Sequence, residues 1–187
     1  EGEPVYNFLK KLDLHKTVTF ERLDPEGYDI FSCPSKNTRF RIPNGLDKWA
    51  ERLSDRYPGS RAPIAAFFET IKTLIREIRR APYEIRWRDF FAGLMTMPHI
   101  LRYRRWTVQD LFNTLGLSPE VCAILSTQMG DIGLGPARSS LLVYAALLEC
   151  YGQGAYYPTR HFRSLTESVA KVIQEAPGCD VIYNSEI

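Results

Sequence analysis

The chain changes pattern near its end, and this change limits the possible folds more than any other feature. Residues 45–152 read as a run of helices, whereas Gly154-Ala-Tyr-Tyr-Pro158 places two strand-forming tyrosines before a proline. From Ser164, which we expect to cap a helix, apolar residues recur at helical spacing up to a Pro-Gly pair. Residues 181–183 then read as a short strand. A strand, a crossover helix and a strand within 153–187 predict a sheet that is shared with something larger.

The N-terminal 44 residues predict a small antiparallel sheet. After a short amphipathic helix at 5–12, strand-like runs occupy 17–23, 28–33 and 38–42. Turn-forming residues separate the three runs, which is typical of a meander. The alternation of the first run is only partial, so two possibilities stay open: a self-contained three-stranded sheet, or a sheet with one face covered by a missing partner.

The middle of the chain predicts consecutive helices with clear ends. Prolines, glycines and capping hydroxyls place helices at 46–57, 60–80, 107–115 and 118–129. The second of these carries an apolar stripe that is typical of a core helix. A further helix at 136–151 is apolar nearly all round, so we expect it to be the central buried helix.

A stretch rich in arginine and aromatic residues lies between these helices. From Arg76 to Trp106 there are eight arginines and three acidic residues, interleaved with large apolar side chains. Such a mixture is typical of helices on a membrane surface, but it also fits a core helix with a solvated arginine face. The residues expected to dock on a membrane are Trp87, Phe90, Phe91, Arg102, Arg104, Arg105 and Trp106.

Several classes of function are disfavoured by the sequence. A net charge of +2 does not favour nucleic acid as the main partner, and four scattered cysteines favour neither a zinc site nor a disulfide scaffold. Gly133-Leu-Gly135 begins like a dinucleotide fingerprint, but Arg138 replaces the third glycine and no strand precedes it. We therefore interpret it as a loop that enters a helix. The chain starts at Glu1 without a methionine, and we expect it to be part of a longer protein.

The late segment also carries a resemblance to a known family. Gly154 to Pro158, the following helix, Gly178 and the final Val-Ile-Tyr-Asn-Ser-Glu-Ile187 resemble the phytoene desaturase, carotenoid isomerase and retinol saturase family of FAD-dependent oxidoreductases. The stretch from Gly133 to Ala145 resembles the part of the family's sequences that lies just before this late segment. This likeness is greater in the saturase-like branch. An earlier stretch, from Phe40 to Phe68, also resembles the family.

The resemblance implies where substrate and cofactor would lie. FAD would be held by segments outside this chain, with Pro158, Arg160 and His161 at the turn that faces the flavin. The family usually has a Gly-Gly pair where Arg160 and His161 stand. A pocket for an apolar polyene would be lined by Tyr156, Tyr157, Leu134 and Tyr144. Strand alternation puts the two adjacent tyrosines on opposite faces, so at most one of them lines the pocket.

These observations together predict an α+β fold that is mostly helical. Residues 1–44 would form the sheet portion, 45–152 the helical portion, and 153–187 the strand–helix–strand leading back to an FAD-binding domain. The resemblance implies the substrate-binding part of an enzyme that desaturates, saturates or isomerises a carotenoid- or retinoid-like substrate. We expect a cytoplasmic location, peripheral to a membrane. The alternative is a non-enzymatic helical module that binds lipid or another protein.

Overall fold

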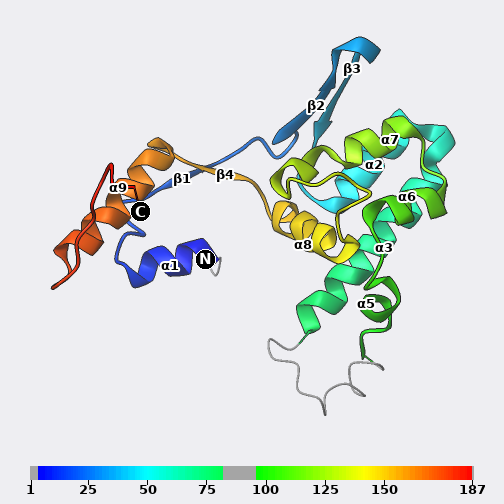
Figure 1. The fold of residues 1–187 in the computed structure, drawn as a ribbon. Helices are drawn as coiled ribbons and strands as arrows, with labels where there is room; N and C mark the ends of the chain where they lie inside the picture. Colours follow the sequence, from blue (N-terminus) through cyan, green and yellow to red (C-terminus); the bar gives the residue numbers. More distant parts are fainter. Residues whose placement is uncertain (1–3, 82–95, 187) are drawn as a thin grey trace. The chain divides into compact units, whose positions relative to one another are not determined.

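A computed structural model describes residues 4–81 and 96–186. The chain forms two compact units, which are considered separately. Unit 1 combines Glu1–Leu23 with Ala155–Ile187, and unit 2 is Asp24–Gly154. The described residues are mostly helical with short antiparallel strand pairs, which confirms the predicted α+β class (Figure 1). No helix in the described ranges is both long enough and apolar enough to span a bilayer.

Helix α3 (Arg61–Arg80) is the centre of unit 2. It contacts α2 (Leu46–Arg56), α5 (Pro98–Tyr103), α6 (Val108–Leu115) and α8 (Leu141–Gly152). Its apolar stripe is buried as predicted, and the rings of Phe67 and Phe68 meet edge to face with their centroids 5.3 Å apart. The stripe residues that lie in the core are Ile64, Phe67, Phe68, Ile71, Leu74 and Ile75.

The prediction of one long central helix at 136–151 was wrong in two respects. Helix α8 begins five residues later, at Leu141, because Ser139 and Ser140 lie in a turn that pairs with the start of α6. Its side facing away from the core is open, and Val143 is 53% exposed. Helix α8 therefore has apolar residues on all its faces, but not all of these faces are buried.

Local capping signals placed both ends of α6 (Val108–Leu115) correctly. The Thr107 hydroxyl accepts from the Asp110 amide while the Asp110 carboxylate accepts from the Thr107 amide, so a complete capping box starts α6. Gly116 ends that helix at φ 63°, a left-handed conformation that glycine adopts without steric cost. Ser118 caps α7 (Pro119–Leu125), but the helix predicted to reach 129 is interrupted at Ser126, after which η3 (Thr127–Asp131) follows.

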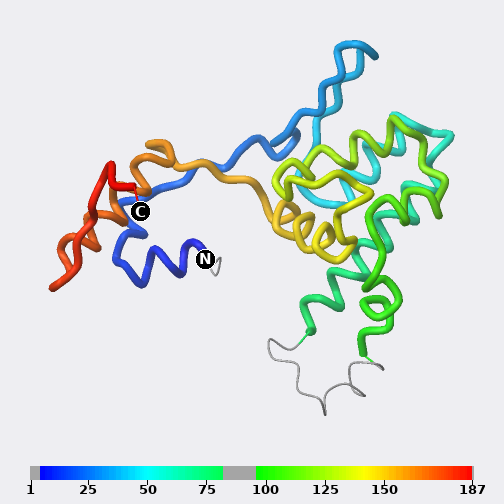
Figure 2. Tube along the Cα trace, viewed as in Figure 1, coloured from blue at the N-terminus to red at the C-terminus, as the bar shows by residue number. Residues whose placement is uncertain are grey.

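The predicted three-stranded meander does not form. Strands β2 (Asp29–Cys33) and β3 (Thr38–Ile42) make an antiparallel hairpin in unit 2, visible as two adjacent traces (Figure 2). Strand β1 (Phe20–Arg22) instead pairs with β4 (Tyr156–Pro158) in unit 1. The expected turn at Asp24 does form, but Arg41 binds the Asp24 carboxylate and the Asn44 amide donates to the Pro25 carbonyl. These contacts hold the turn against β3 and the start of α2, so it does not fold β1 back along β2.

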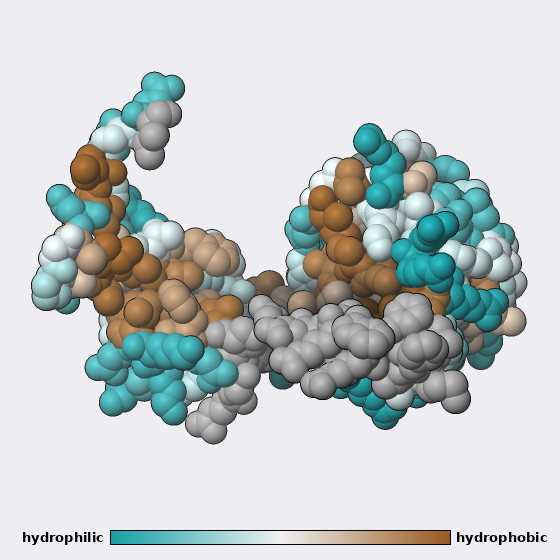
Figure 3. All heavy atoms as spheres, turned by 60° about the horizontal axis from the view of Figure 1, so that its bottom comes forward, coloured by the Kyte–Doolittle hydropathy of each residue, from teal (hydrophilic) through white to brown (hydrophobic). Residues whose placement is uncertain are grey.

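Unit 1 has little interior of its own. It contains α1 (Pro4–Lys11), the β1–β4 pair and α9 (His161–Glu175), and α9 has no buried residue although it is amphipathic. Helix α9 starts at His161, so Ser164 is not its cap as predicted. Residues 181–183 do not form the predicted final strand, and Ile182 is 75% exposed. Apolar side chains of α1 and α9 gather on the surface of this unit (Figure 3).

Candidate functional site

The turn that the resemblance places beside a flavin lies in unit 1, directly after β4. Phe20 is opposite Pro158 in the β1–β4 register, and beyond it the Thr159 amide donates to the Thr19 carbonyl at 3.0 Å. The hydroxyls of Thr19 and Thr159 are hydrogen-bonded at 2.7 Å. Pro158 is buried and is therefore an anchor of the turn rather than an exposed contact.

His161 has the backbone conformation of a glycine. Its φ is 62°, in the left-handed region where a residue with a Cβ is strained by about 1–2 kcal/mol. Its imidazole meets the Tyr157 ring edge to face at 5.9 Å, and Phe162 contacts the same ring at 5.2 Å. Arg160, just before it, is exposed. The turn thus keeps a glycine-type backbone at the position where the resembled family usually has glycine.

We therefore expect His161→Gly to raise the free energy of unfolding by up to about 1 kcal/mol, because glycine relieves the left-handed strain. His161→Val should lower it by at least as much, since a branched Cβ is least tolerated there. Urea denaturation of the whole chain measures both. A loss of stability in the glycine variant would mean that the ring contact with Tyr157 outweighs the strain.

The four residues predicted to line an apolar pocket divide between the two units. Tyr156 and Tyr157 belong to unit 1 and are 46% and 41% exposed. Leu134, on the loop before α8, is also 41% exposed, whereas Tyr144 is completely buried in the core of unit 2. The Tyr144 hydroxyl donates to the Leu125 carbonyl, and its ring packs near Phe67. Burial raises the pKa of Tyr144, so its phenol stays neutral.

The arginines predicted to meet a membrane lie on and just after α5. Arg102, Arg104 and Arg105 are all exposed, and the Arg102 guanidinium stands 5.3 Å from the centre of the Tyr103 ring. Trp106 is half-buried and meets Tyr103 edge to face at 4.9 Å, which ties this segment to the core. The other predicted docking residues, Trp87, Phe90 and Phe91, lie outside the described residues.

Glu77 attaches this arginine-bearing helix to α3. Its side chain is 9% exposed, and its carboxylate accepts from the backbone amides of His99 at 3.2 Å and Ile100 at 2.8 Å. The His99 ring nitrogen Nδ1 lies 2.7 Å from the same carboxylate. Burial alone would raise the pKa of Glu77, but the bonds from Ile100 and His99 outweigh it and the pKa is lowered. A carboxylate among the first amides of α5 is thus kept ionised.

Sequence reasoning missed Glu77, although the sequence held a signal for it. Leu74, Ile75 and Ile78 belong to the apolar stripe of α3, and Glu77 lies among them. A charged side chain at a buried position needs partners, so an acid within a core stripe predicts a cluster of donors facing it.

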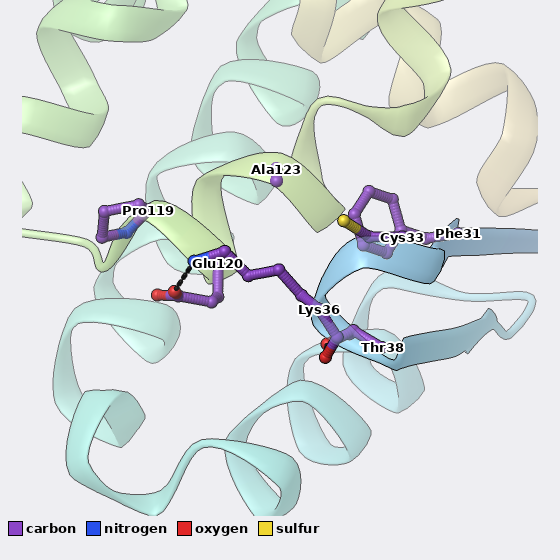
Figure 4. Close-up of a pocket in the computed structure, with 7 residues that line it drawn as sticks. All are labelled: Phe31, Cys33, Lys36, Thr38, Pro119, Glu120 and Ala123. Carbon is purple, nitrogen blue, oxygen red and sulfur yellow. Dashed lines mark hydrogen bonds and ion pairs between the residues drawn. The ribbon is translucent and has the colours of Figure 1, made fainter.

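One pocket of unit 2 lies between the β2–β3 hairpin and α7 (Figure 4). It encloses about 130 Å³ and is bounded by the Lys36–Glu120 ion pair, whose charged atoms are 3.2 Å apart. Cys33 lines it, and hydrogen bonds from the Ser35 hydroxyl and the Lys36 amide lower the pKa of the Cys33 thiol. The pocket is too small for a long polyene, because sites for drug-sized ligands have volumes of about 300–1,000 Å³.

A larger groove, of about 370 Å³, lies among α2, α3 and α8. Four of its five charged groups are paired, since Lys72 binds Asp47 and Arg79 binds Glu149, while the fifth, Arg76, donates to the Thr73 hydroxyl. The bonds to Asp47 and Glu69 raise the pKa of the Lys72 ammonium. Leu46 and Ile75 are its large apolar lining residues, so this groove is too polar to hold a polyene by itself.

The glycine loop that begins like a nucleotide fingerprint does not lie in a nucleotide-binding context. Gly133 and Gly135 follow η3 rather than a strand, and the loop leads into the turn before α8. In the described part of the chain we find no strand–glycine loop–helix unit that would cradle a pyrophosphate. FAD, which the resemblance implies, would have to be held chiefly by residues other than these.

Comparison with known proteins points to one group of enzymes. All-trans-retinol 13,14-reductase of Rattus norvegicus is 26% identical over 156 residues, an alignment that covers 80% of this chain and 26% of that protein. The enzymes of the same name from Macaca fascicularis and Homo sapiens are each 24% identical over 160 residues, covering 81% of this chain and 26% of theirs. No family model and no solved structure matches the sequence.

The chain is thus similar to retinol 13,14-reductases, which agrees with the saturase-like branch of the resemblance. The chain spans about a quarter of the length of the curated relatives that it matches. The similarity extends over four-fifths of the chain, so it is not confined to one motif.

Proposed function

We propose that the chain is the substrate-side part of an oxidoreductase that reduces a carbon–carbon double bond of a retinoid. The observation that carries this proposal is the alignment with the retinol 13,14-reductases over 80% of the chain. The reaction adds two electrons and two protons across one double bond, and the electron donor is oxidised by two electrons. The relatives' name favours reduction over the desaturation and isomerisation that the wider resemblance also allowed.

The electron donor in this proposal is FAD, bound mainly by parts of a longer protein. A reduced flavin supplies the two electrons as a hydride equivalent. The turn at Pro158, Arg160 and His161 would face it, and two features support this: Arg160 is exposed, and the His161 backbone has a glycine-type conformation. A guanidinium at this position would favour the anionic form of a reduced flavin.

The apolar surface of unit 1 supports a role within a larger protein. A sheet of two short strands is marginally stable alone, and α9 buries none of its residues. Tyr156, Tyr157 and Phe162 are exposed beside this sheet. We propose that Tyr157 and Phe162, whose rings are in contact, complete an apolar substrate cavity together with chain outside these 187 residues.

The flavin content of the full-length protein tests this proposal against the alternative. We expect protein expressed from the complete coding sequence to purify with stoichiometric FAD, identified by mass after denaturation. The 187 residues expressed alone should not retain it. A full-length protein without flavin, together with lipid binding by the 187 residues alone, would favour the non-enzymatic binding module.

We further propose that the α5 arginines bring the enzyme to a membrane, where an apolar retinoid is dissolved. Each basic residue near an anionic surface contributes about 1 kcal/mol. Changing Arg102, Arg104 and Arg105 to glutamate should therefore weaken binding to phosphatidylserine-containing liposomes at least tenfold, measured by co-sedimentation.

A matched control separates this local effect from net charge. Arg39, Arg56 and Arg138 are exposed on other elements of unit 2, and their replacement by glutamate makes the same change in charge. This control should retain most of the liposome binding. Equal losses in both triple variants, or no binding by the unmodified protein, would contradict a docking role for α5.

A further inference from the structure

A much smaller cavity of unit 2 lies among α2, η3 and α8, next to Tyr28 just before β2. Its volume is about 10 Å³, close to the space that one water molecule requires. Among the described residues, no carboxylate, ammonium or guanidinium group lines it, and a neutral occupant therefore fits it. The lining residues are Tyr28, Pro43, Gly45, Leu46, Trp49, Gln128, Leu148, Tyr151 and Gly152.

Two buried polar atoms of its lining residues have no hydrogen-bond partner within the described part of the chain. They are the indole Nε1 of Trp49 and the amide Oε1 of Gln128, on side chains of residues that are 2% and 3% exposed. An indole nitrogen can only donate, whereas an amide oxygen can only accept. Each would cost roughly 5- to 100-fold in the folding equilibrium if it stayed unpaired.

We propose that the cavity holds one water molecule that accepts from Trp49 Nε1–H and donates to Gln128 Oε1. The volume, the neutral lining and the complementary pair of unpartnered atoms all fit a single oxygen that both accepts and donates. The proposal does not depend on the orientation of the Gln128 amide. Its nitrogen donates to the Tyr28 hydroxyl, and if the amide were turned, the same water would accept from the nitrogen instead.

The water would complete a polar cluster near the two ends of unit 2. Tyr28 lies four residues after Asp24, where unit 2 begins, and Tyr151 lies three residues before Gly154, where it ends. Their rings are stacked, with centroids 5.7 Å apart and planes 13° from parallel.

Both phenols of this cluster stay neutral. The Tyr151 hydroxyl donates to Asp131, and burial together with this bond raises the pKa of Tyr151 to about 12. Burial raises the pKa of Tyr28 as well. A neutral, hydrated cluster thus joins the two segments at which the chain enters and leaves unit 2.

A high-resolution crystal structure of the chain tests the site directly. We expect one isolated density peak within about 2.7–3.2 Å of both Trp49 Nε1 and the Gln128 amide. Direct donation from Nε1 to a protein acceptor would overturn the proposal, and so would a cavity without density.

The energetic coupling between Trp49 and Gln128, measured by folding stability in solution, provides a second test. One variant replaces Trp49 by 3-benzothienylalanine, which keeps the two-ring shape but has sulfur in place of N–H. The other is Gln128→Met. Each variant should lower the folding equilibrium constant about tenfold. The double variant should lower it by clearly less than a hundredfold, because both changes remove hydrogen bonds to the same water.

The matched control makes the same ring replacement at Trp106, which does not line the cavity. Combined with Gln128→Met, its effect should be the product of the single effects. Independent effects at Trp49 and Gln128 would overturn the bridging water.

Discussion

Replacing Glu77 by alanine is expected to lower the free energy of unfolding of unit 2 by about 3 kcal/mol. The change leaves the amides of His99 and Ile100 without their acceptor and opens a small cavity beside α3. The variant is compared with the unmodified chain by urea denaturation at neutral pH. Glu69→Ala on the same helix is the matched control, because Glu69 is exposed and its surface ion pair with Lys72 is worth at most about 1 kcal/mol.

The pH dependence of stability tests the ionised state of Glu77. Its pKa in the folded chain lies below the ordinary value of 4.5, so the folded state binds this proton more weakly than the unfolded state. The stabilisation is therefore complete above that value and is lost as the pH falls through the folded pKa. Glu77→Gln should flatten this acidic loss of stability. An unchanged pH profile, or a change of under about 0.5 kcal/mol in Glu77→Ala, would show that Glu77 does not hold α5.

Tyr144→Ala should cost about 3–5 kcal/mol, because it removes a fully buried aromatic ring from the core around α3. Leu134→Ala, at a residue predicted to share a pocket with Tyr144, should change stability by less than about 1 kcal/mol because Leu134 is 41% exposed. Tyr144→Phe removes only the hydroxyl that donates to the Leu125 carbonyl and should cost about 1–2 kcal/mol. Thermal and urea denaturation measure all three variants.

The outcome assigns a role to Tyr144. The expected ranking would make it a structural residue whose effect on substrate binding, if any, follows from stability. If Tyr144→Ala leaves the protein stable but abolishes retinoid binding by the full-length protein, Tyr144 would instead be a residue of the substrate pocket.

The features that sequence predicted well are those decided by neighbouring residues. Thr107 with Asp110 forms its capping box within four residues, and Gly116 ends the same helix through its own backbone freedom. The core stripe of α3 follows from helical periodicity alone.

The features that sequence missed depend on residues far apart along the chain. The partner of β1 is β4, more than a hundred residues away, and nothing in the pattern at 17–23 selects it over the nearby β2. Glu77 acquires its role only when the first turn of α5 is brought against it. Residues 181–183 have strand-forming side chains but no strand beside them among the described residues, so their propensity has no ladder to join.

Product analysis tests the proposal that this chain serves an enzyme that reduces a retinoid double bond. Purified full-length protein would be incubated anaerobically with all-trans-retinol and a chemical reductant. The retinoids would then be separated by chromatography and their masses measured by mass spectrometry. We expect a product heavier than retinol by two hydrogens, absent when the protein is heat-denatured. Unchanged retinol, from a protein that is folded and carries its flavin, would contradict it.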